Sequence, residues 1–194
     1  MSINLTKGQR IDLSKDGGGA LKKVVVGLGW DVVDNGPDID CDASAILCGA
    51  DGKTIRKGDV VFYNNQKHPS GSVYSTGDNL TGAGEGDDEQ LIVDMAKIPV
   101  EYDKIVFVVT IYQAKERRQH FGLINNAFIR IVDAETSKEM MKYNLSETYP
   151  GKTGMIFGEI YRKDGKWKFN AIGQATDDGG IVGMSARFGY TSFK

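Results

Sequence analysis

The segment Lys104–Tyr112, KIVFVVTIY, is an almost unbroken run of β-branched and aromatic residues. Such a run is typical of a strand that is buried on both faces inside a sheet. Shorter runs of this kind recur along the chain, with turn-forming residues between them about every 8–12 positions. The other predicted strands are Ile3–Leu5, Arg10–Leu13, Lys22–Trp30, Ala43–Cys48, Val60–Tyr63, Ser72–Ser75, Gln90–Ile98, Ala127–Val132 and Met140–Leu145.

The segment Met155–Gly173 has Lys163-Asp164-Gly165-Lys166 at its centre. Asp-Gly can adopt the two positive φ values of a tight primed turn, so this segment is predicted to be a hairpin. Little helix is expected, and it is confined to Gln113–His120 and Ile181–Phe188. With 25 glycines, 4 prolines and no linker, the pattern predicts an all-β fold, a β-sandwich formed by a single domain over residues 1–194.

The bulk properties limit the partners and the compartment. A net charge of −2 argues against nucleic acid, which calls for a basic domain. The N-terminal residues lack the apolar core of a signal peptide, and there is no apolar run long enough to cross a membrane. Cys41 and Cys48 lie an odd number of positions apart, so on one strand they would face opposite ways and stay unpaired. These features favour a cytoplasmic protein.

Two stretches are strongly acidic. Asp31–Asp42, DVVDNGPDIDCD, and Gly77–Glu89, GDNLTGAGEGDDE, each contain five acids and no basic residue. Each adjoins a predicted strand, and the loops of a sandwich gather at its two ends. Carboxylates brought together raise one another's pKa or bind a cation, so the pattern predicts a metal site.

Calcium is the ion that these residues suit best, because it takes about 6–8 oxygens from carboxylates, amides, carbonyls and water. In the second stretch the predicted side-chain ligands are Asp78, Asn79, Thr81, Asp87, Asp88 and Glu89, and the predicted carbonyl ligands are Leu80, Gly82, Gly84 and Gly86. The first stretch adds Asp31 at a strand end, and Asp38, Asp40 and Asp42, which an extended backbone places on one face. One ion takes about four or five carboxylates, so ten acids suggest two adjacent ions.

Other interpretations remain open at this point. Asp78 and Glu89 have the spacing of EF-hand positions 1 and 12, but Leu80 and Ala83 occupy positions that the motif reserves for a ligand and a glycine. Magnesium is the main competing ion, and a metal-dependent phosphohydrolase using the same acidic loops is the alternative function. Direct binding of an oxyanion would fall to the two cysteines, neither of which has a neighbouring cation in the sequence.

Several motifs carry a resemblance to a known family. They are VGLGWD at 26–31, DIDCDAS at 38–44, VFYNN at 61–65, GDNLTGAGEGDDE at 77–89, KIVFVVTIYQAKERRQHFG at 104–122 and GEIYRKDGKWKF at 158–169. Together they resemble the TerD family, which is named for bacterial tellurite resistance and stress response. The resemblance implies a β-sandwich of two mainly antiparallel sheets with calcium-binding loops at one end, in the manner of calcium-dependent phospholipid-binding modules.

The same resemblance implies partners among other proteins of the same stress-resistance system and a location at the inner face of the membrane. It supplies no chemical mechanism. We therefore expect a non-catalytic interaction or sensor module, not an enzyme, with two adjacent calcium ions. Its contacts with an anionic membrane or a phosphate group are expected to depend on calcium.

Overall fold

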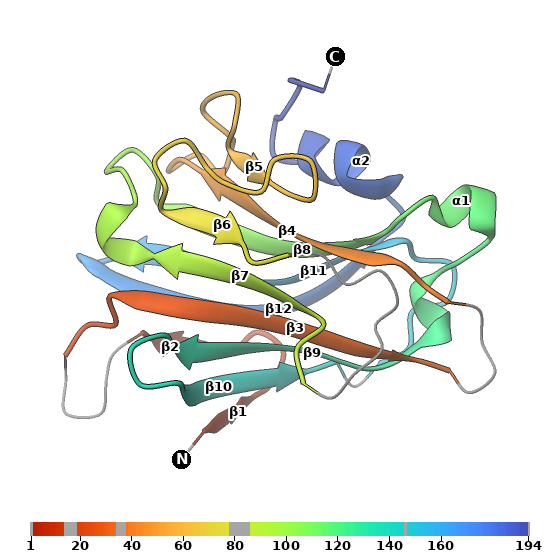
Figure 1. Ribbon diagram of the computed structural model, residues 1–194, viewed down its shortest axis with the longest axis horizontal. Helices are drawn as coiled ribbons and strands as arrows, with labels where there is room; N and C mark the ends of the chain where they lie inside the picture. Colours follow the sequence, from red (N-terminus) through yellow and green to blue (C-terminus); the bar gives the residue numbers. More distant parts are fainter. Residues whose placement is uncertain (1, 14–18, 34–37, 78–85, 146, 194) are drawn as a thin grey trace.

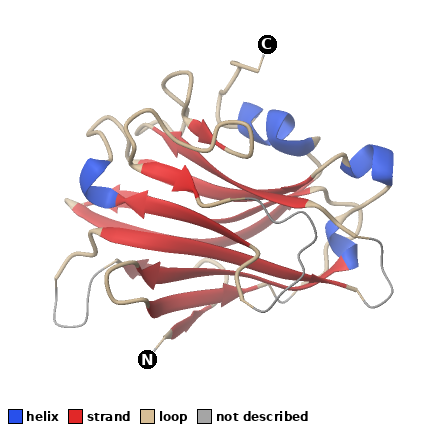
Figure 2. Cartoon of the chain, in the orientation of Figure 1, coloured by secondary structure: helices blue, strands red, loops and turns tan. Residues whose placement is uncertain are grey.

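The computed structural model describes residues 2–13, 19–33, 38–77, 86–145 and 147–193, and these residues form two six-stranded sheets that pack face to face (Figures 1 and 2). The first, here called the β3 sheet, contains in order β1 (Ile3–Leu5), β10 (Lys138–Asn144), β9 (Ile124–Asp133), β3 (Lys23–Val32), β7 (Glu89–Asp94) and β6 (Val73–Ser75). The second, the β8 sheet, contains β2 (Arg10–Asp12), β12 (Lys166–Thr176), β11 (Gly154–Lys163), β8 (Lys104–Ile111), β4 (Cys41–Cys48) and β5 (Val60–Val61).

The predicted all-β sandwich of two mainly antiparallel sheets is confirmed. Of the strand pairs in the described residues, β1 with β10 is parallel, and the others are antiparallel. The predicted hairpin is β11–β12, and Asp164 and Gly165 at its turn have φ values of 53° and 72°. Both short helices also form, as α1 (Ala114–Arg117) and α2 (Gly180–Ala186).

Two hydrophobic layers hold the sandwich together. The larger lies between the sheets and includes Leu28, Cys41, Phe107 and Ile131. The smaller lies on the outer face of the β8 sheet, where Ile181 and Met184 of α2 pack on it, as Figure 1 shows. Since β8 has a hydrophobic layer on each side, its nearly continuous apolar sequence is explained.

Several strand ends differ from the predictions by a few residues, and two of these differences have a clear backbone cause. Phe62 and Asn65 exchange backbone hydrogen bonds of 3.1 and 2.9 Å, so the chain reverses at once and β5 ends at Val61, before the predicted Tyr63. The strand predicted over Gln90–Ile98 ends at Asp94, because the 3₁₀ turn η1 (Met95–Lys97) follows directly. A second 3₁₀ turn, η2 (Phe121–Leu123), precedes β9.

The end of β3, the start of β4 and α1 lie on the same side of the sandwich, at the right of Figure 1. The first acidic stretch joins β3 to β4, and the second leads into β7, the neighbour of β3. The described residues of the two stretches that adjoin these strands, Asp31, Asp42, Asp88 and Glu89, therefore lie at one end of the fold.

Candidate metal centre

Carboxylates from both acidic stretches surround the start of β4. Burial raises the pKa of the Cys41 thiol well above its ordinary value, and the nearby charges of Asp42, Glu89, Asp40 and Asp88 raise it further. Four carboxylates close enough to affect one buried thiol come from segments that are far apart in the sequence. The fold thus creates a local concentration of negative charge, which a cation would relieve.

Two of these acids are fixed by backbone hydrogen bonds. Asp88 accepts a hydrogen bond from the Trp30 N–H at 2.8 Å through Oδ2, while its own N–H donates to the Leu28 carbonyl at 2.9 Å. Glu89 accepts from the Ala43 N–H at 2.6 Å through Oε2. The second acidic stretch is therefore anchored both to β3 and to β4, one strand from each sheet.

Asp31 and Asp88 lie near each other at the end of β3. Burial raises the pKa of Asp88; the hydrogen bond from Trp30 opposes this, and the charges of Asp31 and Asp87 raise the pKa further. Asp31 itself is exposed, and its Oδ2 accepts a hydrogen bond from Asn126 Nδ2 at 2.8 Å. A positive ion placed between Asp88 and Asp31 would stabilise the charged form of the Asp88 carboxyl.

A cavity of about 480 Å³ opens beside this pair. It is lined by Trp30, Asp31, Gly86, Asp88, Asn126, Phe128, Lys142, Asn144 and Leu145. Lys142 Nζ lies 3.8 Å from the centroid of the Phe128 ring, and this cation lines the same cavity as the two carboxylates. The indole Nε1 of Trp30 is buried, with no acceptor among the residues that the structure describes.

Asp87 is placed differently from its two neighbours. Both of its carboxylate oxygens accept hydrogen bonds from the Arg130 guanidinium, at 2.7 and 3.0 Å, and Oδ2 also accepts from Gln90 Nε2 at 3.0 Å. Its side chain is 1% exposed, so this carboxylate lies in a closed ion pair on the sheet.

The three aspartates of the first stretch that the sequence places on one face differ in exposure. Asp38 is exposed, and its carbonyl accepts a hydrogen bond from Gln119 Nε2 at 2.7 Å. Asp40 is half-buried, with its Oδ2 3.9 Å from Arg117 Nη1. Asp42 is buried within β4, which begins two residues before its predicted start and pairs Asp42 with Thr110 of β8.

The remaining predicted ligands, Asp78, Asn79, Leu80, Thr81, Gly82 and Gly84, lie outside the described residues. Within the described part, no three His, Cys, Asp or Glu side chains are grouped so that they could hold one metal ion. The chemistry of the donors nevertheless fits calcium, because carboxylate and amide oxygens line the same cavity as Asp88, whose pKa is raised.

The structure also contains a polar network that the sequence did not reveal. His68 is buried, and its Nε2 lies 3.3 Å from Asp59 Oδ1. The Ser70 N–H donates to His68 Nδ1 at 3.1 Å, so Nε2 carries the proton that points to Asp59. Tyr102 donates to the same Asp59 oxygen at 2.6 Å.

This network joins three loops and has the residue types of a Ser–His–Asp triad. Ser70 Oγ, however, lies 2.7 Å from Ser72 Oγ and accepts a hydrogen bond from the Ser72 N–H at 3.2 Å. A serine held in its own turn in this way is a structural residue, and we interpret the network as one that fixes the loops around β5 and β6.

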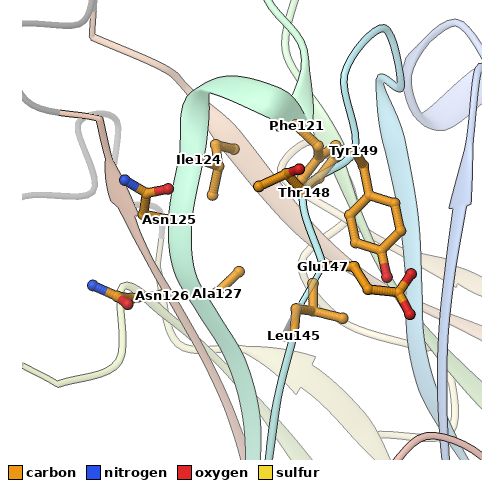
Figure 3. A pocket seen from close by; sticks show the side chains of 9 residues that line it. All are labelled: Phe121, Ile124, Asn125, Asn126, Ala127, Leu145, Glu147, Thr148 and Tyr149. Atoms are coloured by element: carbon orange, nitrogen blue, oxygen red, sulfur yellow. The ribbon is translucent and has the colours of Figure 1, made fainter.

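A second cavity, of about 280 Å³, lies next to the acidic end (Figure 3). It shares Asn126 and Leu145 with the larger cavity. Figure 3 shows Glu147 and Tyr149 with their polar ends side by side on one wall. Burial raises the pKa of Tyr149 to about 12, and the charge and hydrogen bond of Glu147 add to this, so the phenol stays a neutral donor.

No helix in the described residues is long and apolar enough to cross a bilayer.

Comparison with known proteins gives a family for this arrangement. A family profile for the TerD domain matches residues 1–188. General stress protein 16U of Bacillus subtilis is 48% identical over 191 residues, covering 97% of this chain and 98% of that protein. Tellurium resistance protein TerD of Serratia marcescens is 47% identical over 190 residues, with coverage of 97% and 98%.

Solved structures agree with the fold. The crystal structure of SAV2460, titled as a protein of unknown function, superposes with a TM-score of 0.67 at 26% identity, over 84% of this chain and 94% of that one. A homologue of telluride resistance protein from Streptomyces coelicolor, SCO6318, superposes with a TM-score of 0.64 at 21% identity, over 84% and 95%, and shows the fold alone. With a matching profile over almost its whole length and relatives at nearly half identity, the chain belongs to the TerD family.

Proposed function

We propose that this protein is a calcium-dependent, non-catalytic interaction module of a tellurite-resistance or stress-response system. The observation that carries the proposal is that Asp88 bonds to the backbone of β3 and Glu89 to the backbone of β4, the strand that holds Asp42 and directly follows Asp40 of the other acidic stretch. Repulsion among these charges disfavours the folded state, and a bound divalent cation would offset it. The stress and tellurium resistance in the names of its relatives supply the biological setting.

The ligands of two adjacent ions would come from both stretches. Asp31 and Asp88 line the larger cavity and would serve one ion, together with carbonyl oxygens such as that of Gly86. Asp40, Asp42 and Glu89 lie deeper, around Cys41, and would serve or orient ligands of the other. The stretch that contains Asp78, Asn79, Leu80, Thr81, Gly82 and Gly84 would complete the coordination shells.

The larger cavity is where a partner would meet the metal. Its lining includes Lys142 as well as Asp31 and Asp88, so calcium bound to those two acids would turn the cavity positive. A positive cavity accepts a phosphate or carboxylate group and not a cation. The partner class is therefore anionic: a lipid surface at the inner face of the membrane, or an acidic segment of another protein from the same resistance system.

Calorimetry of chelator-stripped protein, with magnesium in the buffer, tests the metal site. We expect micromolar or tighter calcium binding, near two ions per chain, that is lost in an Asp78→Ala/Asp88→Ala variant. The matched control is Asp164→Asn, which removes one carboxylate at the tight turn and keeps a residue that tolerates positive φ. The absence of calcium heat, or binding that survives the double substitution, would reject the site.

Sedimentation with vesicles tests the anionic partner. Binding to phosphatidylserine vesicles should require calcium, should not occur with phosphatidylcholine alone, and should weaken in Lys142→Gln. If calcium leaves the affinity unchanged, the interaction role is wrong. Turnover of a generic phosphomonoester with magnesium, lost in Asp88→Asn, would show that the same acids act in an enzyme.

A further inference from the structure

The second acidic stretch ends in three successive acids, Asp87, Asp88 and Glu89, and each of them contacts a different partner. Asp87 pairs with Arg130 of β9, Asp88 bonds to the backbone of β3, and Glu89 bonds to the backbone of β4. From these contacts we propose that Asp87 is not a calcium ligand but a positioning residue, held by Arg130 so that Asp88 and Glu89 face the metal. This inference rests on the proposed calcium site.

The position of Asp87 is built into the sheet. Gly27 of β3 lies directly between Gln90 of β7 and Arg130 of β9 in the strand register. The Asp87 carboxylate lies over Gly27 and accepts hydrogen bonds from both of these neighbours. Its location is thus determined by three adjacent strands at one register position.

Gly27 is the residue that makes room for the carboxylate. A Cβ atom built on Gly27 would lie 2.2 Å from Asp87 Oδ2 and 2.4 Å from Oδ1. The φ angle of Gly27 is not in the left-handed region, so the backbone itself would accept alanine. Glycine at this position therefore leaves room for the Asp87 carboxylate above the strand. The VGLG motif at 26–29 and Asp87 thus belong to one structural unit.

The Arg130–Asp87 pair leaves Asp87 little capacity for a metal. A two-pronged guanidinium contact uses both carboxylate oxygens, and the side chain is almost fully enclosed. Arg130 is held from its other side by Glu139, whose Oε2 lies 3.1 Å from Nη1. A calcium ion bound to Asp87 would have to displace a cation that stays beside it, and the two positive charges would repel.

The two roles for Asp87 predict opposite effects of changing Arg130. If Asp87 is a ligand, removing the guanidinium frees its carboxylate and calcium should bind more tightly. If Asp87 is a positioning residue, the same change releases the Gly86–Glu89 segment and calcium should bind more weakly. Arg130→Lys is the sharpest variant, because it keeps the positive charge and removes the two-pronged contact.

The experiment is a calcium titration of wild type, Arg130→Lys, Gly27→Ala and Asp87→Ala, under conditions where circular dichroism shows each variant to be folded. We expect all three to lose about 10-fold or more in calcium affinity, the usual effect of removing a residue that orients a ligand. The double variant Asp87→Ala/Arg130→Lys should lose no more than either single variant, since both remove one contact.

The controls separate this role from general destabilisation. Arg56→Lys alters an ion pair with Glu101 outside the acidic cluster, and Gly49→Ala adds a Cβ whose nearest neighbour is 3.4 Å away. Both should keep wild-type calcium affinity, whatever their melting temperatures in chelator. Unchanged or tighter calcium binding by Arg130→Lys would overturn the positioning role, whereas a wild type that binds no calcium would overturn the proposed function itself.

Discussion

Glu89 accepts a hydrogen bond of 2.6 Å from the backbone N–H of Ala43, and this bond joins a strand of the β3 sheet to a strand of the β8 sheet. β5 pairs with β4 at Ala45 and Ile46, so the Ala43 N–H lies beyond the end of that pairing. The buried carboxylate of Glu89 takes the place of a strand partner for this donor.

Glu89→Ala should lower the free energy of unfolding by about 1–3 kcal/mol in chelator, because it leaves a buried backbone donor unsatisfied. Glu89→Gln should restore part of the loss, since its side-chain carbonyl can still accept. Urea denaturation measures both. Glu116→Ala, on the exposed face of α1, is the control, and an equal loss there would show that the Ala43 contact is not responsible.

Asp59 should make stability depend on acid. Burial raises the pKa of this carboxyl, but hydrogen bonds from His68, Tyr102 and the N–H groups of Arg56 and Ile55 outweigh burial and leave the pKa below its ordinary value of 3.8. The unfolded chain therefore binds the proton more readily. The stabilisation is complete above about pH 5 and is lost as the pH falls through the lowered native pKa.

Asp59→Asn should accordingly cost about 1.5–3 kcal/mol at neutral pH. It should also make the free energy of unfolding depend less on pH between about pH 5 and pH 3. Denaturation at a series of pH values measures the slope, with Asp164→Asn as the control. A variant whose curve stays parallel to that of wild type would contradict the role of Asp59.

The cysteines should be chemically inert in the native protein. Both are buried and free; burial raises the pKa of Cys41 well above its ordinary value and that of Cys48 to about 12. The thiolate is the reactive form, so labelling by a disulfide reagent should be orders of magnitude slower in the folded protein than in urea. Fast labelling of either thiol under native conditions would revive thiol chemistry on tellurite as a function.

At the β11–β12 turn, the cost in stability of adding a side chain should depend on the backbone φ angle and not on the space available. Gly165 has a φ of 72°, and a Cβ placed there would meet nothing within 4 Å. Gly165→Ala should therefore cost about 1–2 kcal/mol through the left-handed backbone alone. Gly49→Ala, at an ordinary φ, is the matched control in thermal denaturation. An equal melting temperature for the two variants would show that the positive φ of Gly165 is not the cause of the loss.

Sequence alone predicts the strands well because their signal is local. The run KIVFVVTIY becomes β8, and Asp164-Gly165 forms the turn between β11 and β12, since residue type and spacing determine both. Strand ends are less predictable. β5 stops early because Phe62 pairs with Asn65, a contact between backbone groups that carries no side-chain signature.

The candidate site is predictable in composition but not in geometry. Ten acids in two stretches point to a cation, and the fold does bring the described residues Asp42 and Glu89, one from each stretch, together. Which acid faces which partner depends on residues far away in the chain. Arg130 lies 43 positions from Asp87, and only the strand register of β3 and β9 makes them neighbours. His68 and Asp59 are only nine positions apart, but they lie in two loops whose conformations are not evident from residue type.

The long-range pairing of β3 with β9, which matches residue 24 with residue 133, also bears on the order of folding. The β11–β12 hairpin closes a short loop and can form early, whereas β3 must wait until most of the chain has been brought together. We expect contacts that depend on β3, among them Asp87 over Gly27, to form after the rate-limiting barrier. Substitutions in the acidic cluster should hence speed unfolding and leave the folding rate almost unchanged, so this end of the protein governs how long the native state lasts.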